Sequence, residues 1–248
     1  MQQKNAKQGR SRSWVGALSV GWMSTAMLAG CASAPGDPLY GYNKSMFSVN
    51  KDVDHAVIKP VATAYVRAVP PLVRQGARNF FGNLGDVDYT ANDFLQLDIH
   101  DGMNGVMRVG VNTLFGLGGV LDLATDMRLY KRPNDFGLTL ARWGVGRGPY
   151  VVLPIFGPST LRDAFGSVIQ SAYANPMGQV HDIPVRNSLQ VFGLVNTRAN
   201  LLQTTNLLEQ IDLDPYVFTR NAYLQMRAAK VQRIRHEGIL HRDDGAAS

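Results

Sequence analysis

The sequence predicts a mostly α protein whose mature part forms one domain. Apolar residues recur every three or four positions along most of the chain, which is typical of amphipathic helices. Asp-Pro and Lys-Pro steps, which favour helix starts, occur several times, and strand-like segments are few. The chain is long enough for one sizeable core, and no internal repeat or low-complexity linker divides it.

The chain begins with a segment typical of an export signal. Residues 14–29 carry no charge, and a basic segment precedes them through Lys4, Lys7, Arg10 and Arg12. The uncharged stretch is short and rich in Ser and Gly, so it favours a signal peptide over a membrane-spanning helix. Leu28-Ala29-Gly30-Cys31 then matches the lipobox of bacterial lipoprotein precursors.

Cys31 is the only cysteine of the chain. A single thiol in an exported protein has no internal partner, and acylation of Cys31 would account for it. Several acyl chains on one residue suffice for stable membrane anchoring. Ala32 follows the cysteine where an aspartate often retains lipoproteins in the inner membrane, which favours the outer membrane. The alternative is an ordinary signal peptide with a chance cysteine.

These features divide the chain into four parts. We expect a lipoprotein signal peptide over 1–30, a lipidated tether over 31–36, a helical domain over 37–236 and a polar, disordered tail over 237–248. The excess of basic residues lies in the signal and in the tail that starts near Arg227, so the high isoelectric point is poor support for nucleic-acid binding.

In the first half of the domain, the residue pattern predicts five helices. The first begins at Asp37-Pro38 and carries an amphipathic stripe as far as Val53. The second begins at Lys59-Pro60 and ends at Pro70-Pro71. The others are expected over 72–81, 86–97 and 101–115, the last loosened by Gly102, Gly105 and Gly110.

In the second half, one strand and three helices are expected. Residues 150–153 favour a strand, which Pro149 and Pro154 keep short. A helix with a clear apolar face begins at Pro158-Ser159 and ends at Asn175-Pro176. Two more helices follow, over about 185–203 and from Asp214-Pro215 to about Arg235.

The one-sided helices leave two interpretations open. No mature segment reaches 18 uninterrupted apolar residues, so none is expected to span a bilayer alone. The apolar faces, rich in aromatic and Met residues, could pack into an ordinary soluble core. They could equally lie in a membrane interface, helped by the acyl anchor.

Motifs for catalysis and for metal or nucleotide binding are weak. Gly144 to Gly148 is only superficially similar to a dinucleotide loop, because Pro149 follows it and no helix start receives the phosphates. Two polar segments contain residues that suggest a metal site: Asp98, His100 and Asp101 in one, and His181 and Asp182 in the other. Neither segment has further ligands at a recognisable spacing, so these are expected to be solvated loop residues. Arg162 is expected in a structural ion pair and Asp163 near a helix start. We therefore predict no catalytic residue, metal or cofactor.

Several stretches together resemble the MlaA (VacJ) family of outer-membrane lipoproteins. The resemblance is collinear over about residues 37–227 and is densest between Phe136 and Asp163, around Gly146-Arg147-Gly148-Pro149-Tyr150. The positions that match the family's motifs, with a structural or channel role, are Asn43, Phe47, Asn50, Asn79, Asn83, Asn112, Gly116, Gly118, Gly119, Asp122, Gly146, Gly148, Tyr150, Pro154, Arg162 and Asp163.

The resemblance implies a fold and a function. The fold would be a ring of short amphipathic helices seated in one leaflet of the outer membrane, on the periplasmic face, and enclosing an amphipathic channel. The protein would remove mislocalised phospholipid from the outer leaflet and pass it to a periplasmic lipid-binding protein, which maintains lipid asymmetry. Association with a trimeric outer-membrane porin would be expected, and no bond would be broken.

Two alternative functions remain. One is a structural lipoprotein that scaffolds a porin. The other is a periplasm-facing lipid hydrolase, which the missing nucleophile constellation disfavours. Within the channel hypothesis, we expect a movable hairpin in residues 116–135, hinged at Gly116 to Gly119 and at Arg132 to Asn134.

Overall fold

The computed structural model describes residues 36–173, 176–209 and 214–246, with side chains within 36–172, 176–209 and 214–235. The lipobox and Cys31 therefore lie outside the described residues. Within them the chain is mostly helical, as predicted. The elements are α2 (Tyr40–Val53), the π-helix η1 (Asp54–Ile58), α3 (Lys59–Ala68), α4 (Pro71–Leu95), α5 (Ile99–Leu114), α6 (Leu123–Asp126), α7 (Phe136–Arg142), β1 (Tyr150–Leu153), β2 (Gly157–Thr160), α8 (Leu161–Tyr173), the 3-10 helix η2 (Pro176–Gln179), α9 (Ile183–Leu208) and α10 (Pro215–Ala246).

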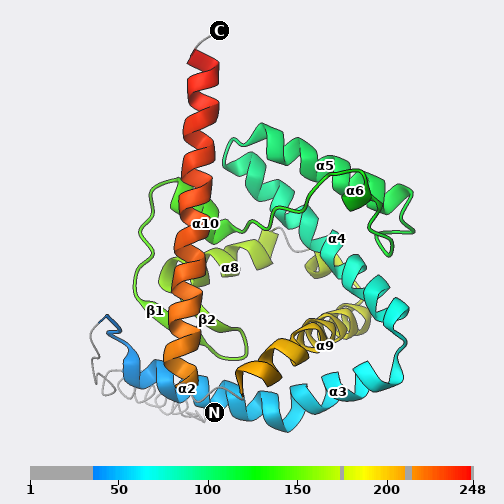
Figure 1. Ribbon diagram of the computed structural model, residues 1–248, viewed down its shortest axis with the longest axis vertical. Coiled ribbons are helices and arrows are strands. Elements are labelled where there is room, and N and C mark those ends of the chain that lie inside the picture. Colours follow the sequence, from blue (N-terminus) through cyan, green and yellow to red (C-terminus); the bar gives the residue numbers. More distant parts are fainter. Residues whose placement is uncertain (1–35, 174–175, 210–213, 247–248) are drawn as a thin grey trace, which may run out of the picture.

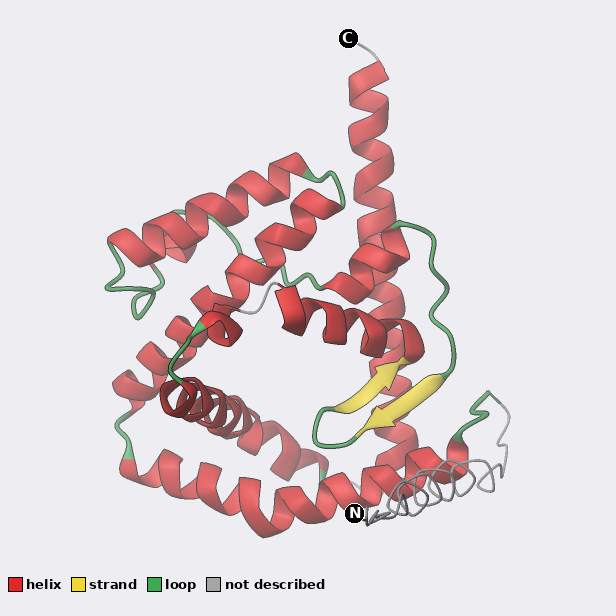
Figure 2. Ribbon diagram, turned by 180° about the vertical axis from the view of Figure 1, so that it is seen from behind, coloured by secondary structure: helices red, strands yellow, loops and turns green. Residues whose placement is uncertain are grey.

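The helices are arranged as a ring. Figure 1 shows α2 and α3 along one edge, α4 rising from the end of α3, and α10 on the opposite side. The same ring is seen from behind in Figure 2, where the β1–β2 hairpin, in yellow, faces its middle. Among the described residues, no helix combines the length and the apolar character that crossing a membrane requires.

The helix predicted from Lys59-Pro60 to Pro70-Pro71 is confirmed as α3, but it is not separate from the helix before it. Residues on both sides of η1 keep helical backbone angles, so α2, η1 and α3 form one continuous rod. A proline in a regular helix lacks the donor N–H and collides with the carbonyl four residues earlier. A wider π turn lies just before Pro60 and leaves more room for the proline ring, so the helix continues although the N–H is missing.

The two helices predicted over 72–81 and 86–97 are a single helix, α4, which packs along α5. Gly82 and Gly85 do not end it. The glycines of α5 do not interrupt that helix, and two of them, Gly102 and Gly105, allow close packing on α4. A Cβ atom at Gly105 would lie 2.2 Å from Thr90 Oγ1, and one at Gly102 would lie 2.7 Å from the Phe94 ring.

The strand predicted over 150–153 is confirmed, and β2 is its antiparallel partner, with Tyr150 opposite Thr160. The helix start predicted at Pro158-Ser159 is therefore wrong, because these residues belong to β2 and α8 begins at Leu161. Asn50 of α2 holds the turn between the strands: its Nδ2 donates to Leu153 O at 2.8 Å, and its Oδ1 accepts from Ile155 N at 2.8 Å.

The last two helices are longer than predicted. α9 begins at Ile183, with Asp182 as its N-cap, and continues to Leu208. α10 begins at Pro215, where Asp214 accepts a hydrogen bond from Tyr216 N at 2.9 Å, as the Asp-Pro step predicts. It continues to Ala246, beyond the predicted end near Arg235, so residues 237–246 are helical and not a disordered tail. Figure 1 shows this end of α10 projecting beyond the ring.

Buried polar side chains join the elements of the ring. Among the described residues, buried polar and charged side chains outnumber buried apolar ones. Asn43 of α2 is fully buried and donates from Nδ2 to Asp37 Oδ1 at 2.9 Å and to Tyr150 O at 3.1 Å. Its Oδ1 accepts from Val152 N at 2.8 Å. Asp37, predicted as an N-cap, instead accepts the Tyr216 hydroxyl of α10.

A second buried polar group holds the segment after α5. Arg108, only 3% exposed, donates to Asp86 Oδ2 of α4 at 3.2 Å and to Asp122 Oδ1 at 3.1 Å. It also donates to Thr125 Oγ1 at 3.1 Å and to the Leu129 carbonyl. The segment 116–135 thus contains α6 and is attached to α5 at several points, and its movement remains a prediction.

We predict that Asn43→Ala destabilises the fold. The change leaves the Val152 N–H and the Asp37 carboxylate without their buried partner, which should lower the free energy of unfolding by about 3 kcal/mol. Unfolding of the purified protein in detergent, followed by circular dichroism, measures the loss. Asn206→Ala, an exposed change within a helix, is the matched control. Equal stability of the two variants would contradict the assignment.

Asp93, buried in α4, predicts a pH dependence of stability. Burial raises its pKa from 3.8 to about 6, although a hydrogen bond from Asn134 lowers it. As the pH falls from about 6 toward 4, the folded protein therefore binds a proton that the unfolded chain does not, so this contribution to stability rises. Asp93→Asn, which mimics the neutral form, should raise the melting temperature at pH 8 and change it little at pH 4.5. A pH-independent difference, like that expected for the exposed Asp126→Asn, would refute this.

Candidate functional site

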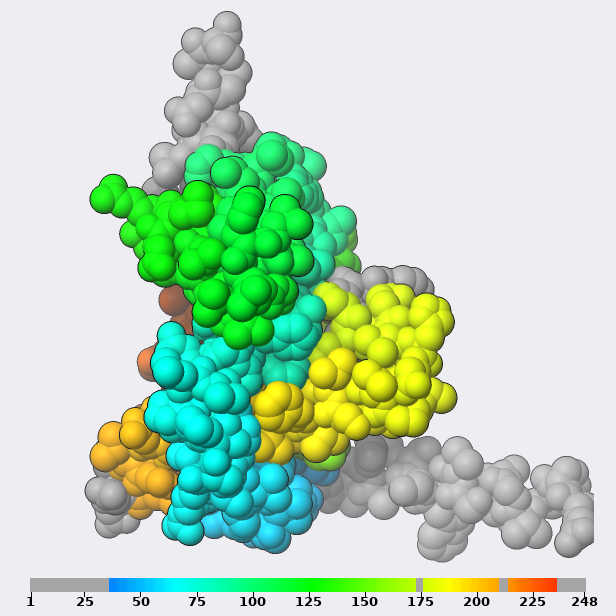
Figure 3. Space-filling model, turned by 90° about the vertical axis from the view of Figure 1, so that its right-hand side faces the viewer, coloured from blue at the N-terminus to red at the C-terminus, as the bar shows by residue number. Residues whose placement is uncertain are grey.

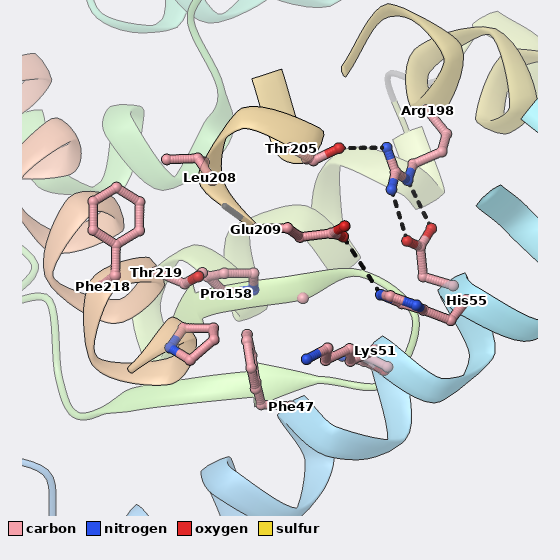
Figure 4. Close-up of a pocket in the computed structure, with 14 residues that line it drawn as sticks. Phe47, Lys51, His55, Pro158, Arg198, Thr205, Leu208, Glu209, Phe218 and Thr219 are labelled. Atoms are coloured by element: carbon pink, nitrogen blue, oxygen red, sulfur yellow. Dashed lines mark hydrogen bonds and ion pairs between the residues drawn. The ribbon is translucent and has the colours of Figure 1, made fainter. Parts of the chain in front are cut away.

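A pocket of about 600 Å³ opens inside the ring. Four parts of the chain form it: the face of α2 and η1 that points inward, the β1–β2 hairpin, the end of α9 and the start of α10 (Figure 4). We call it the ring pocket. Its charged side is formed by Lys51, Asp54, His55, Arg198 and Glu209, and its apolar side by Phe47, Pro158, Leu208, Pro215 and Phe218.

Ion pairs between α2–η1 and α9 make up the charged side. Arg198 binds the Asp54 carboxylate through two hydrogen bonds of 2.7 and 2.8 Å, and it donates to Thr205 Oγ1 at 3.0 Å. The Asp54 carboxylate raises the pKa of Arg198. Figure 4 shows Glu209 pointing toward His55, with Glu209 Oε1 lying 3.5 Å from His55 Nε2.

A lysine binds Glu209 from outside the pocket. Lys59 Nζ lies 2.8 Å from Glu209 Oε2, and this hydrogen bond lowers the pKa of Glu209. Asp54 and Glu209 are thus neutralised by cations of the protein. Lys51, by contrast, is exposed and forms no ion pair within the described part of the chain. Its ammonium is available to an anionic group in the pocket.

The apolar side lies toward the hairpin and α10. Phe47 contacts the Tyr216 ring edge to face, with 5.7 Å between the ring centres. Figure 4 shows Leu208 and Phe218 beside each other, away from the ion pairs. The pocket therefore has one charged end and one apolar end, a combination that suits an amphiphilic ligand.

Local sequence spacing explains how each element contributes. Asp54 and His55 follow Lys51 by three and four positions, and Lys51 follows Phe47 by four, so these residues share one face of the α2–η1 rod. Arg198, Thr205 and Leu208 share a face of α9 in the same way. The face of α9 meets the rod because α9 packs against α3, which continues that rod.

Of the predicted site residues, only Phe47 and Asn50 line the ring pocket. A second group lies at the junction of α2, β1 and α10. It contains Asn43, Tyr150, which is 3% exposed, and Pro154 in the hairpin turn. These residues position the wall of the pocket and have no contact with its interior.

A third group lies along the seam between α4, α5 and α6, well away from the ring pocket. Asp122 caps α6 and accepts Asn112 Nδ2 at 3.0 Å. Gly119 has φ of 96°, and a Cβ atom there would lie 2.7 Å from Asn83. Two more members pack in the same seam: Asn79, whose Nδ2 donates to Val120 O at 3.0 Å, and the buried Gly116. Gly118 lies exposed in the turn.

The fourth group surrounds the start of α8. Arg162 forms the ion pair expected of it: Nη2 lies 2.8 Å from Asp163 Oδ1, and both side chains are buried. Asp163 also binds Arg227 of α10, with Nη2 to Oδ1 at 2.6 Å. Burial alone would raise the pKa of Asp163, but these hydrogen bonds lower it. Gly146 and Gly148 lie in the preceding loop.

Most of the residues considered as metal ligands have structural contacts, and His181 is exposed. Asp98 caps α5, accepting Asp101 N at 3.0 Å, and Asp182 caps α9. Asp101 is not a solvated loop residue as expected, because it is 7% exposed and binds Arg132 at 2.8 Å. Within the described ranges, no group of three or more His, Cys, Asp or Glu side chains is placed to hold a metal ion.

The sequence did not predict that residues of α2–η1 and α9 form the charged side of the ring pocket. Asp54 and Arg198 lie 144 residues apart in the chain and meet only when α9 packs on α3. The spacing of Lys51, Asp54 and His55 on one helix face is a local signal for half of the cluster. No local signal pairs that face with α9.

Comparison with known proteins places the chain in a family. The family model described as "MlaA lipoprotein" matches residues 35–230. A relative from Escherichia coli (strain K12), "Intermembrane phospholipid transport system lipoprotein MlaA", is 38% identical over 218 residues, covering 84% of this chain and 86% of the relative. A relative of the same name from Haemophilus influenzae is 32% identical, covering 84% of this chain and 88% of the relative.

A solved structure shares the fold as well as the sequence. It comes from work on the "structural basis for maintenance of bacterial outer membrane lipid asymmetry" and is 38% identical, with a TM-score of 0.68, covering 79% of this chain and 98% of the other. The ring of helices is therefore common to both. This chain belongs to the MlaA lipoprotein family.

Proposed function

We propose that this protein is an outer-membrane lipoprotein of an intermembrane phospholipid transport system. It removes mislocalised phospholipid from the outer leaflet and passes it to a periplasmic lipid-binding protein, which maintains lipid asymmetry. The names of its relatives and its solved neighbour support this proposal. The observation that carries it is the ring pocket, which has a charged end and an apolar end.

The ring pocket matches the chemistry of a phospholipid. A phosphate group would meet the Lys51 ammonium, which has no ion-pair partner among the described residues. Acyl chains would contact Phe47, Leu208 and Phe218 at the other end. Because Asp54 and Glu209 are already paired with cations, they repel a phosphate less than free carboxylates would. Such a pocket can pass a lipid along without reacting with it.

The outer surface supports seating in a membrane. α5 buries its polar residues, among them Asp101 and Arg108, against the body of the protein. Its other face carries exposed apolar side chains, with Met103 at 51% and Leu114 at 77% exposed. Figure 3 shows this segment, in green, at the surface of one end of the molecule. Apolar faces of this kind are stable in a membrane interface and unfavourable in water.

The same arrangement recurs in α8, and it supports the membrane interpretation of the amphipathic stripes. Leu161, Phe165 and Val168 form its apolar face and are 59%, 61% and 66% exposed. Arg162 and Asp163 on the opposite face are buried. An ordinary soluble core would bury the first set and expose the second. These stripes therefore favour a helical ring whose apolar faces lie in a membrane interface. The proposal places this ring in one leaflet, on the periplasmic side and close to a porin trimer.

We predict that filling the ring pocket blocks transport. Thr219 lines the pocket from α10, and Thr219→Trp should place a large side chain in the lipid path. In cells that lack their own copy, the variant should restore the lipid barrier poorly, with transfer reduced about tenfold, equivalent to about 1.4 kcal/mol. Surface phospholipid and detergent sensitivity measure the effect. Gln225→Trp, an exposed change on the same helix, is the control and should restore the barrier.

Several results would contradict the proposal. Normal surface phospholipid in a clean deletion strain would exclude a role in lipid asymmetry. Full activity of Thr219→Trp would exclude passage through the ring pocket. Release of lyso-lipid by the purified protein would favour the hydrolase alternative. Co-purification with a porin but with no lipid would favour a purely structural lipoprotein.

We predict that Cys31→Ser abolishes function by removing the anchor. Without acyl chains, the interfacial helices alone must hold the protein at the membrane, and the variant should move to the soluble fraction. Cell fractionation and complementation of the deletion strain measure both effects. Ser33→Ala leaves the lipobox intact and is the control. A Cys31→Ser protein that stays in the outer membrane and restores asymmetry would show that the anchor is dispensable.

A further inference from the structure

A second pocket, of about 270 Å³, lies on α10 away from the ring pocket. It is bounded by the loop after α7, by the end of β2 and the start of α8, and by one side of α10. The α10 side is a stripe at helical spacing that includes Leu224, Ala228, Val231 and Arg235. The two pockets share no lining residue.

Four guanidinium groups line this second pocket, which we call the arginine pocket: Arg147, Arg162, Arg227 and Arg235. None of its lining residues in the described part of the chain is acidic. Arg162 pairs with the Asp163 carboxylate, and Arg227 pairs with both Asp163 and Asp135. Arg147 and Arg235 are exposed and form no ion pair with any described residue. Two carboxylates thus face four cations, and the pocket keeps an excess of positive charge.

Arg162 has guanidinium N–H groups at the pocket that donate no hydrogen bond to a described residue. Only 5% of its side chain is exposed. Nε and Nη2 donate to Asp163 Oδ1 at 3.0 and 2.8 Å. Among the described residues, Nη1 has no hydrogen-bond partner. Because a guanidinium carries N–H donors on all three nitrogens, this buried group can still bind an acceptor.

The ligand class follows from these donors and from the size of the pocket. Arginine forks match phosphate and carboxylate oxygens, and a phosphate offers more acceptors and more charge to converging guanidiniums. Val145, Leu224 and Val231 supply apolar walls beside the cations. The volume suits a phosphate on a short stem such as glycerol, and it is too small for a whole two-chain lipid.

We propose that the arginine pocket binds the phosphate of a small phosphate ester or of a phospholipid headgroup whose acyl chains remain outside. The proposal does not depend on the transport function, because a water-soluble ester tests it without lipid. The loop that carries Arg147 contains Gly144 and Gly148, with φ of 93° and 66°, so its course is set by glycine conformations. Loss of the ring pocket by Thr219→Trp leaves every lining residue of the arginine pocket unchanged.

The test is titration of the purified, acylated protein in nonionic detergent. Calorimetry at constant ionic strength measures binding of sodium glycerol 3-phosphate, and a second titration uses short-chain phosphatidic acid in the same detergent. The variant is Arg147→Gln with Arg235→Gln, since both residues are exposed and unpaired. The control, Arg67→Gln with Arg78→Gln, removes equal charge from exposed sites elsewhere. The first variant should weaken binding at least about tenfold, and the control should not.

Each outcome decides the question. Binding of glycerol 3-phosphate that depends on Arg147 and Arg235 identifies a site for soluble phosphate esters. Binding of phosphatidic acid alone, with the same dependence, identifies a headgroup site. Absence of binding to either probe, or equal weakening by both double variants, overturns the proposal. If the double variant does not fold, Arg147→Gln alone carries the test, because Arg147 lies in an exposed loop.

Discussion

Arg227 donates to two carboxylates from different parts of the ring, Asp135 at the start of α7 and Asp163 in α8, over distances of 2.6–3.0 Å. This contact joins α10 to α7 and α8. At the start of α10, Tyr216 binds Asp37 beside α2. The two contacts close the ring, because α10 is the element that meets both its first and its later segments. Removing one partner would leave an uncompensated buried charge, which is far more costly than the loss of a surface ion pair.

A ring with a pocket in its middle has little room for a large apolar core. Its apolar clusters are small, such as Leu138, Ala141 and Ile234 between α7 and α10. Cohesion therefore depends on buried side chains that are hydrogen bonded in several directions, as Asn43 and Arg108 are. Such networks stabilise only when their members are satisfied, since an unpaired polar group in a low-dielectric interior is costly. This explains why so many of the motif residues are Asn, Asp and Arg at junctions, and why few of them touch the pocket.

The helix α10 connects the ring pocket and the arginine pocket. Its first turns contribute Phe218 and Thr219 to the ring pocket, and later turns contribute Arg227 and Arg235 to the arginine pocket. The strand β2 connects them as well, with Pro158 in one lining and Thr160 in the other. Both proposed sites recognise the same chemistry, a phosphate beside apolar groups. They differ in size, and only the ring pocket offers a long apolar side.

Local sequence patterns predict much of the secondary structure, and the local lipobox motif predicts lipidation of Cys31. The Val-Val-Leu segment between prolines predicted β1, and Asp214-Pro215 predicted the start of α10. The same signals failed at two places: the helix continues past Pro60 through a π turn, and α4 stays helical through Gly82 and Gly85. Periodicity alone also located the amphipathic faces. It could not tell which face points inward, because a protein core and a lipid layer both remove apolar groups from water. Only the tertiary structure placed Arg162 and Asp163 inside and Phe165 outside, and only it brought Asp54 and Arg198 together.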